Sequence, residues 1–402
     1  MSSRKRYKVG ILSTHPIQYY VPWYRQLAKN PEVDLTVYFS HSQTSEDHGK
    51  AGYGISFDWD IPMLEGYRYI FLKNMSANPN VFNFFGCDTP EIKDIIKNGN
   101  FDAFIVEGWH KKGLWQAIFA CWKTKTPLLV RGDSNLVSHG GGTIKRLVKY
   151  PIYNWFIPKF SAYLVVGKYA KEYYLHYGGK EEKMFFTPHC VDNEFFSNGH
   201  DSLLPNRGEL RKKWNIPEDA VVFVLVGRLI PRKRPDDFIS AIQKASKANP
   251  KIWGLIVGDG PIKSDIQNKS EREEIQIKFT GFLNQGELPM AYTVSDCLVN
   301  TSFSESWGLT INEAMASSLP ALVSNTVGCA PDLVHPEETG HIFQCGNIDE
   351  LSDVMISLAS NTENLSRMGK NAFNFIQKYS IQNTADGVLE AIKSISNIKN
   401  VL

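Results

Sequence analysis

The sequence predicts an α/β protein with two doubly wound, Rossmann-like domains that face a central cleft. Three observations carry this prediction. Short apolar runs alternate with helix-like stretches in the first half, and the same rhythm restarts after a polar stretch. The chain is also long enough to bury two cores, because 43% of its 402 residues are hydrophobic. Alternating strands and helices favour parallel sheets, which bind their ligands at the carboxyl ends of the strands.

The first domain is predicted to span residues 1–195. Its expected strands are the apolar runs Val9 to Ser13, Val33 to Phe39, Phe101 to Val106 and Pro127 to Val130. Each run is short and is followed by polar or turn-forming residues, as in a parallel sheet whose strands are buried on both faces.

A polar stretch that contains Gly and Pro, residues 196–219, is predicted to be a linker. The second domain, residues 220–380, begins with a new buried strand over 221–227. Its further strands are expected at Ile252 to Val257, Ile275 to Phe279, Asp296 to Asn300 and Pro320 to Val323. Residues 381–402 have a helix-like pattern, and we expect this helix to pack back on the first domain, with the second domain as the alternative.

Charge and cysteine usage narrow the functional classes. A formal charge of +2 provides no bulk attraction for nucleic acid, so we expect no nucleic-acid partner. The six cysteines show no C-x-x-C spacing, which favours reduced thiols and argues against a structural zinc site. No apolar run is long enough to span a bilayer, and the first residues lead directly into a strand. We therefore predict a cytoplasmic protein.

Two glutamates, Glu305 and Glu313, flank the predicted start of a helix. Gly308 ends a loop, and Leu309 and Met315 belong to the apolar face of the helix that follows. The free N–H groups of the first turn should therefore face the same cleft as both carboxylates. A helix N-terminus favours phosphate, whereas a carboxylate accepts hydrogen bonds from sugar and ribose hydroxyls. Sugar nucleotides carry both kinds of group.

The segment from Gly227 to Pro235 leaves the first strand of the second domain, where a doubly wound sheet presents a ligand loop. We interpret Arg228 and Lys233 as a phosphate clamp, because a guanidinium and an ammonium together can neutralise a diphosphate leaving group. The alternative is a solvated basic loop. The strand-end position and the pair of glutamates favour the clamp.

These motifs make the chain resemble the retaining glycosyltransferases of family four, which have the GT-B fold. The resemblance covers essentially the whole second half. It rests on G-R-L-x3-K from Gly227 to Lys233, the Gly258-Asp259-Gly260-Pro261 turn, Phe279-Thr280-Gly281-Phe282 and E-x7-E from Glu305 to Glu313. The fold implied is GT-B, and the activity implied is transfer of a sugar from a nucleoside diphosphate sugar with retention of configuration.

The resemblance also implies roles for residues of the second domain. Glu305 would contact the donor sugar, Glu313 would hold the ribose diol, and Arg228 with Lys233 would stabilise the diphosphate. Phe282 and Leu283 would border the nucleobase. The remaining implied donor-binding residues are Gly227 in the loop after the first strand, with Ser306, Trp307, Gly308, Leu309 and Thr310 at the helix start. Ser306-Trp307 departs from the family's usual Gly-Phe, and we expect the larger ring to alter the sugar pocket.

The first domain matches the family less closely, because Ser13-Thr14-His15-Pro16 stands where a glycine-rich turn is usual. His110 follows a strand end and resembles the family's first-domain histidine near the donor sugar, so we assign it a catalytic role. His15, Arg131 and Asp133 are predicted to face the acceptor. A structural loop histidine and a helix N-cap are the alternatives for His15 and Asp133.

Two further patterns concern a metal and a membrane. Asp58-Trp59-Asp60 matches the D-x-D metal motif but lacks a strand-end context, so we predict no metal and no cofactor other than the co-substrate. Residues 143–163 mix lysines with aromatic side chains, which suits a helix resting at lipid headgroups on the inner face of the membrane. The alternative is an amphipathic helix packed on the first domain, since Pro151 and Pro158 interrupt its periodicity.

The function predicted from these observations is retaining transfer of a sugar to a hydroxyl of a glycan or lipid-linked acceptor, in surface polysaccharide or glycolipid assembly. One alternative is a sugar-nucleotide epimerase or hydrolase, which would act on the donor alone. Another is an inactive partner subunit, which would be expected to have lost Arg228, Lys233 or one of the two glutamates.

Overall fold

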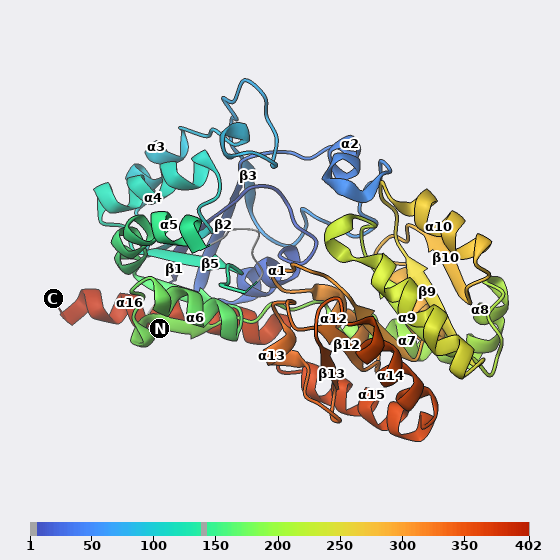
Figure 1. Cartoon of the computed structure of the whole chain (residues 1–402). Coiled ribbons are helices and arrows are strands. Elements are labelled where there is room, and N and C mark those ends of the chain that lie inside the picture. The colour runs from blue at the N-terminus through green and yellow to red at the C-terminus, as the bar shows by residue number, and fades with distance from the viewer. Residues whose placement is uncertain (1–5, 138–142, 402) are drawn as a thin grey trace. The chain divides into compact units, whose positions relative to one another are not determined.

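The computed structural model describes residues 6–137 and 143–401, which form two compact units (Figure 1). Unit 1 contains residues 6–47, 62–137, 143–189 and 381–401. Unit 2 contains residues 48–61 and 190–380. The sequence placed a single boundary near residue 195, whereas the contacts also transfer residues 48–61 to unit 2.

The described residues of unit 1 form a seven-stranded parallel sheet in the order β3-β2-β1-β4-β5-β6-β7. The strands are β1 (Tyr7–Ser13), β2 (Val33–Phe39), β3 (Tyr69–Phe71), β4 (Ala103–Glu107), β5 (Leu128–Gly132), β6 (Ala162–Val165) and β7 (Met184–Phe186). The chain runs outward from β1 to β3 and then returns to place β4 on the other side of β1. This reversal makes the carboxyl ends of β1 and β4 the expected ligand position.

Helices connect and cover these strands. They are α1 (Val21–Lys29), α2 (Ser45–His48), α3 (Ile92–Gly99), α4 (Lys112–Thr124), α5 (Thr143–Phe156), α6 (Lys168–His176) and α16 (Ile381–Val401). The last of these is the predicted C-terminal helix, and it belongs to unit 1. Its buried Val388, Ala391 and Ile392 join the core formed by β1, β2 and α1.

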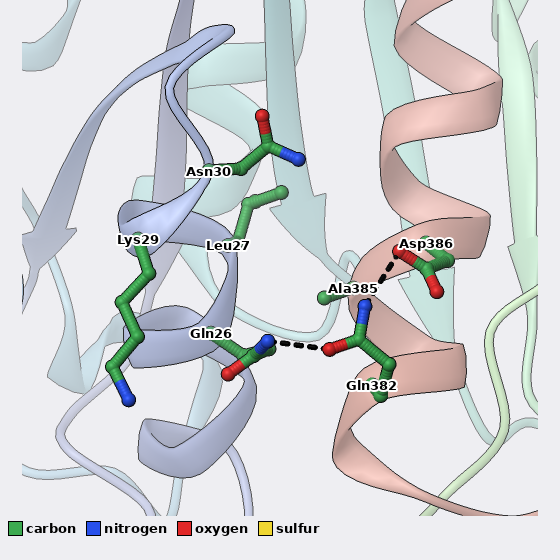
Figure 2. Close-up of a pocket in the computed structure, with 7 residues that line it drawn as sticks. All are labelled: Gln26, Leu27, Lys29, Asn30, Gln382, Ala385 and Asp386. Atoms are coloured by element: carbon green, nitrogen blue, oxygen red, sulfur yellow. Dashed lines mark hydrogen bonds between the residues drawn. The ribbon is translucent and has the colours of Figure 1, made fainter.

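The contact between α1 and α16 is polar at its edge (Figure 2). Gln26 donates a hydrogen bond to the side-chain oxygen of Gln382. The side-chain nitrogen of Gln382 donates in turn to Asp386 over 2.8 Å. A small cavity of about 100 Å³ lies beside these residues. The apolar core therefore fixes α16, and the glutamines pair at its rim.

The described residues of unit 2 form a six-stranded parallel sheet in the order β10-β9-β8-β11-β12-β13. The strands are β8 (Val221–Val226), β9 (Ile252–Val257), β10 (Ile277–Gly281), β11 (Cys297–Asn300), β12 (Ala321–Ser324) and β13 (Gly340–Phe343). The helices are α7 (Asn193–Leu203), α8 (Arg207–Lys213), α9 (Pro235–Ala248), α10 (Lys263–Arg272), α11 (Leu288–Val294), α12 (Leu309–Ala316), α13 (Ala330–Leu333), α14 (Ile348–Ala359) and α15 (Thr362–Ile376). The order reverses between β8 and β11, so the ligand position is expected there.

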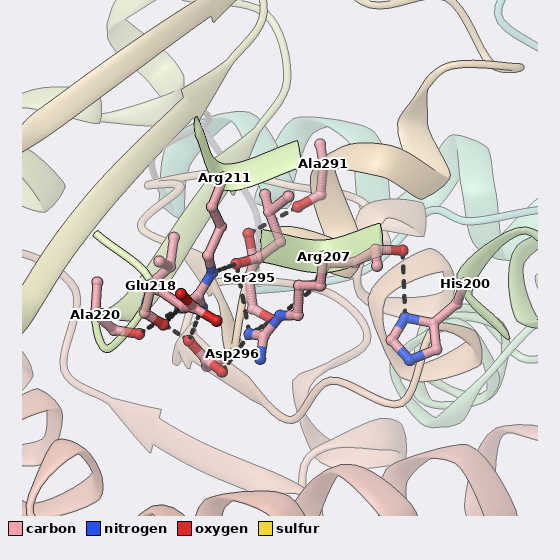
Figure 3. A network of polar contacts seen from close by, with 11 residues as sticks. His200, Arg207, Arg211, Glu218, Ala220, Ala291, Ser295 and Asp296 are labelled. Atoms are coloured by element: carbon pink, nitrogen blue, oxygen red, sulfur yellow. Dashed lines mark hydrogen bonds and ion pairs between the residues drawn. The ribbon is translucent and has the colours of Figure 1, made fainter. Parts of the chain in front are cut away.

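The predicted linker, residues 196–219, is largely helical. Helix α8 is fixed to the sheet through Asp296, which precedes β11 (Figure 3). Arg207 and Arg211 bond its two carboxylate oxygens over 2.6 and 2.9 Å, and one of these oxygens also accepts the N–H of Val222 over 2.8 Å. Arg211 is 3% exposed. The buried guanidinium of Arg211 has to be paired, so its bonds to Asp296 make the segment a fixed part of unit 2.

The cysteines agree with the reduced state expected from their spacing. All six lie in the described residues, none of them forms a disulfide bond there, and five of the six are buried. None of the described helices combines the length and hydrophobicity needed to span a bilayer.

Candidate active site

The loop after β8 starts at a glycine that the backbone requires. Gly227 has a φ of 145°, in the region that only glycine adopts readily. A Cβ added to Gly258 would lie only 1.9 Å from the Gly227 carbonyl oxygen. The loops after β8 and β9 therefore contact each other through their backbones. Arg228 follows directly, and its side chain is half-buried. The predicted clamp loop thus lies at the carboxyl edge of the sheet, beside the reversal between β8 and β11.

Lys233 and Glu305 form an ion pair that joins the loops after β8 and β11. The Lys233 ammonium donates a hydrogen bond to Oε2 of Glu305, and each side chain is 15% exposed. Burial alone would raise the pKa of Glu305, but Lys233, Arg232 and Arg228 outweigh burial and hold that pKa below its ordinary value. Glu305 is therefore ionised at neutral pH. The sequence predicted both residues for one site, and the structure brings them into contact.

The helix start after Glu305 has the predicted geometry. Gly308 caps α12 with a φ of 108°, and Leu309 and Thr310 open the first turn with half-buried side chains. The preceding strand-like segment is held in place because Gly328 N–H donates to the Glu305 carbonyl over 3.0 Å. The amides at this helix start therefore follow Glu305 of the ion pair within a few residues of the chain.

Trp307 is placed differently from the expectation that its ring would shape a sugar pocket. The side chain is only 4% exposed, and its indole N–H donates to Asn312 over 2.9 Å. The ring packs near Tyr379, with their centroids 6.1 Å apart. A partner for the indole N–H one turn into α12 makes this buried position favourable. The backbone of Trp307, rather than its ring, remains near the helix start.

Glu313 lies in the second turn of α12 and is fully buried. Tyr292 of α11 donates a hydrogen bond to its Oε2 over 2.6 Å. On the loop after β10, Phe282 and Leu283 are half-buried. The loop reaches them through Gly281, whose φ is 76°. Every donor-binding residue predicted from sequence thus lies in unit 2, on the loops that follow β8, β10 and β11 or on α12.

Unit 1 has its own cavity at the carboxyl ends of β1, β4 and β5. Its volume is about 220 Å³, and all four side chains that sequence predicted for unit 1, His15, His110, Arg131 and Asp133, line it. The other lining residues are Thr14, Ile17, Tyr20, Val81, Glu107, Gly108, Trp109, Gly132 and Ser134. The cavity lies at the reversal between β1 and β4, where doubly wound sheets bind ligands.

Arg131 forms the floor of this cavity and is 2% exposed. One of its nitrogens, Nη2, donates to the Pro188 carbonyl over 3.2 Å, and the guanidinium lies 5.1 Å from the ring centroid of Tyr20. Its Nε and Nη1 have no hydrogen-bond partner among the described residues. A buried donor without a partner is costly, so a ligand that supplies an acceptor here would be favoured.

Glu107 is a site residue that sequence reasoning did not select. It ends β4, is buried, and accepts a 2.6 Å hydrogen bond from Tyr24. Burial raises its pKa from 4.5 to about 7, although hydrogen bonds from Ser13 and Tyr24 and the charge of Arg131 oppose this rise. Its position directly before the Gly108-Trp109-His110 stretch was the available signal. The pKa of His110 is lowered by burial and then by Lys111, so this histidine is neutral at pH 7.

In the structure, the Asp58-Trp59-Asp60 match provides a hydrogen-bond acceptor for a backbone N–H group. Asp60 accepts the N–H of Gly286 over 2.9 Å. Within residues 6–137 and 143–401, no group of three His, Cys, Asp or Glu side chains is placed to hold a metal ion.

Comparison with known families and curated proteins shows that part of the chain is similar to glycosyltransferases. Residues 206–375 match the family described as glycosyl transferases group 1. The alpha-monoglucosyldiacylglycerol synthase of Acholeplasma laidlawii is 31% identical over 165 residues, which are 40% of this chain and 41% of that protein. The UDP-Gal:alpha-D-GlcNAc-diphosphoundecaprenol alpha-1,3-galactosyltransferase of Escherichia coli is 30% identical over 202 residues, 48% of this chain and 49% of that protein. The chain thus spans about half the length of the curated relatives it matches.

Solved structures match nearly the whole chain. Anabaena HepE in complex with UDP and glucose aligns with a TM-score of 0.71 at 16% identity, covering 97% of this chain and all of that one. WaaG, described as a glycosyltransferase of lipopolysaccharide biosynthesis, aligns with a TM-score of 0.65 at 14% identity, covering 96% and 99%. At such low identity these matches establish the fold alone, which is GT-B.

Proposed function

Residues 206–375 belong to the glycosyl transferases group 1 family, and from this premise we propose that the chain transfers a sugar from a nucleoside diphosphate sugar to a hydroxyl group. The observation that carries the proposal is the ion pair between Lys233 and Glu305, next to Arg228 and just ahead of the start of α12. The pair places a cation for a diphosphate and an ionised acceptor for sugar hydroxyls at one point.

The leaving diphosphate is the group that needs most stabilisation. Arg228 and Lys233 are proposed to neutralise the charge that develops on it as the bond to the sugar breaks. The amides of Gly308, Leu309 and Thr310 would donate to its phosphate oxygens. Because these groups supply the positive charge, we propose that no metal is required. Lys233 would then divide its hydrogen bonds between Glu305 and the diphosphate.

The sugar and the nucleoside engage the glutamates. Glu305 is proposed to accept hydrogen bonds from donor-sugar hydroxyls, and Glu313 to accept them from the ribose diol. Gly227, Phe282 and Leu283 would border the nucleobase, and Ser306 with the backbone of Trp307 would border the sugar. The family resemblance implies retention, so we propose attack from the leaving-group face, with the departing diphosphate taking the acceptor's proton.

The acceptor is proposed to bind at the unit 1 cavity. Its lining combines neutral His110 with His15, Asp133, Arg131 and Glu107, whose pKa of about 7 leaves it half-protonated at neutral pH. These groups suit hydroxyl-rich ligands rather than polyanions. Relatives are named for glycolipid synthesis and for transfer to a diphosphoundecaprenol-linked sugar. We therefore propose a glycan or lipid-linked acceptor in surface polysaccharide or glycolipid assembly, with His110 also reaching the donor sugar.

Helix α5 is proposed to rest on the inner face of the cytoplasmic membrane. Four of its apolar side chains, Leu147, Val148, Ile152 and Trp155, are each more than half exposed. Lys159 lies against Trp155, with Nζ 3.4 Å from the ring centroid. Exposed apolar groups beside lysines suit anionic headgroups, and the exposure favours this reading over a helix packed on unit 1. The side chains of Lys145 and Arg146, which also entered the prediction, lie outside the described part.

A thermal-shift screen with nucleoside diphosphates and their sugars tests the donor assignment, since a ligand that binds only the folded chain raises its melting temperature. We expect a selective shift with one sugar nucleotide that is lost in Glu313→Ala. Product analysis with and without an acceptor then separates transfer from donor hydrolysis or epimerisation. An absence of any shift would favour an inactive partner subunit.

A further inference from the structure

Residues 48–61 form a segment whose place in the fold differs from its place in the sequence. The chain on both sides of this segment, residues 6–47 and residues 62 onward through β3, belongs to unit 1. The contacts of residues 48–61 nevertheless group this segment with unit 2. We call residues 48–61 the strap. The mechanism described so far assigns it no role.

Backbone and side-chain bonds hold the strap to the loop after β10. Asn284 donates its side-chain amide to the Asp58 carbonyl over 2.8 Å, and Gly286 N–H donates to Asp60 over 2.9 Å. Gly54, with a φ of 77°, lies so close to the loop after β9 that a Cβ there would be 3.4 Å from Gly260. The strap therefore crosses the carboxyl edge of the sheet at β9 and β10, on the nucleotide side of the reversal.

The strap adds rings to Phe282, the residue proposed to border the nucleobase. The ring centroids of Phe57 and Phe282 are 4.4 Å apart, and those of Tyr53 and Phe282 are 5.8 Å apart. Trp59 packs edge-on against Phe57 at 4.9 Å. His48 fixes the turn by a 2.7 Å hydrogen bond between Nδ1 and the Phe57 carbonyl. Tyr53, Phe57 and Phe282 all remain partly exposed, so the cluster presents ring surface.

Tyr53 also reaches the charged part of the site. The Arg228 guanidinium carbon lies 5.7 Å from the Tyr53 ring centroid, and a Cβ on the neighbouring Gly52 would lie 3.7 Å from the Arg228 side chain. Burial raises the pKa of Tyr53, Arg228 lowers it, and Glu313 and Glu305 raise it further. Tyr53 is therefore close enough to Arg228, Glu313 and Glu305 to interact with the charges of three of the residues that the proposed function places at the donor.

We infer that the strap is a wall of the nucleotide site, in which Tyr53 holds Arg228 against the diphosphate and Tyr53 with Phe57 and Phe282 forms the surface on which the nucleobase stacks. The inference rests on the proposed function, because it assumes that unit 2 binds a nucleoside diphosphate. Rings beside a cation match a ligand that carries a flat base next to phosphate. Tyr53 is a positioning residue for Arg228, and Phe57 is a contact for the base.

Calorimetric titration of the full chain with UDP, GDP, ADP and inorganic pyrophosphate tests whether Tyr53 positions Arg228 and whether Phe57 contacts the base. Phe57→Leu should weaken the best nucleoside diphosphate by about threefold to tenfold and leave pyrophosphate unchanged, because only stacking is lost. Tyr53→Leu should weaken both by about tenfold, and Tyr53→Phe should restore most of the affinity because it keeps the ring. Ser56→Ala, an exposed change on the same strap, should alter neither.

The outcomes separate this inference from the proposed function. If the unmodified chain binds none of the nucleotides, the proposed function fails and the inference fails with it. If it binds one of them and both leucine variants bind equally well, the strap inference alone is overturned. Tighter binding by Tyr53→Leu would also overturn it, since the strap would then occupy the place of the base. Melting temperatures equal to that of Ser56→Ala would show that the variants are folded.

Discussion

Two glutamates, one at the carboxyl edge of each sheet, have pKa values shifted in opposite directions, because burial prevails at one and neighbouring cations prevail at the other. Glu107 of unit 1 has Tyr24 and Ser13 as hydrogen-bond donors and a pKa raised to about 7. Glu305 of unit 2 is paired with Lys233, and its pKa is lowered. The two sheets share their parallel architecture and their reversal of strand order. The residues that follow the strands, rather than the architecture, decide the charge of each site.

The difference suits the two substrates that a sugar transfer requires. Under the proposed function, the cations and the ionised carboxylate of unit 2 would bind a diphosphate sugar, whereas the neutral His110 and the half-protonated Glu107 of unit 1 would bind hydroxyl groups.

Removal of the unit 2 cation should affect turnover most. Lys233→Ala is expected to lower kcat by about 100-fold or more, with a smaller change in donor affinity, because the ammonium acts on charge that develops in the transition state. Steady-state kinetics with varied donor measures both constants. Lys244→Ala, which removes a solvent-exposed lysine paired with Asp349, is the matched control. An equal loss in donor affinity and kcat would instead indicate uniform binding.

The two glutamates should give opposite pH dependences of stability. The folded pKa of Glu107 lies above its unfolded value of about 4.5, so this carboxyl favours folding at low pH and loses that contribution as the pH rises through about 7. Glu107→Gln should therefore stabilise the chain at pH 8 by up to roughly 3 kcal/mol, with little effect at pH 4.

Glu305→Gln should behave in the reverse manner. The folded pKa of Glu305 is depressed, so its contribution is present above the unfolded pKa and disappears as the pH falls through the folded one. The variant should be less stable than the unmodified chain at pH 7, with a difference that shrinks in acid. Denaturant unfolding at several pH values checks both variants, and parallel curves for the two would refute the contrast.

The role of Glu313 can be tested on the ligand as well as on the protein. Glu313→Gln keeps an acceptor for Tyr292 but loses the charge, and it should weaken a ribonucleoside diphosphate by about tenfold. The same ligand with 2′-deoxyribose should be weak for the unmodified chain and unchanged by the substitution. Calorimetry on the four combinations gives the coupling, and a similar loss for both ligands would place Glu313 away from the ribose.

Membrane contact is the smallest predicted effect and belongs to unit 1 alone. Trp155→Ser should reduce co-sedimentation with vesicles that contain anionic lipid by a few fold, because it removes an exposed apolar side chain from the proposed interface. Leu204→Ser is the control, because Leu204 is an exposed apolar residue of unit 2. Equal binding by the unmodified chain and Trp155→Ser would remove α5 from the interface.

The residues selected from sequence in unit 2 lie on a few short segments, because the patterns that indicated them are local. Gly308 and Glu313 lie on one helix start, and Arg228 and Lys233 lie on one loop. The long central strands were likewise found. Four short strands, β3, β6, β7 and β13, were not predicted. They have only three or four residues each, and Tyr69 to Phe71 of β3 are exposed and carry no buried alternation. Helix α8 was taken for a linker because its anchor, Asp296, lies far along the chain.

Unit 1 was harder to predict because its site depends on contacts between distant residues. The raised pKa of Glu107 results chiefly from its burial. Nη2 of Arg131 donates to the distant Pro188 carbonyl, whereas its Nε and Nη1 are buried without a partner among the described residues. In unit 2, the buried position of the Trp307 ring likewise depends on its contacts with Asn312 and Tyr379. The sequence pattern around Trp307 did not indicate these contacts. The strap could not be foreseen, since its partners begin more than 150 residues later.

The return of α16 to unit 1 has a consequence for the order in which the protein can fold during synthesis. Val388, Ala391 and Ile392 complete the core around α1 and β1, but a ribosome produces them after every residue of unit 2. A growing chain can therefore finish unit 2 while the apolar surface of α1 still lacks its cover. Domains generally fold as they emerge, so here the unit that begins first is the one that finishes last.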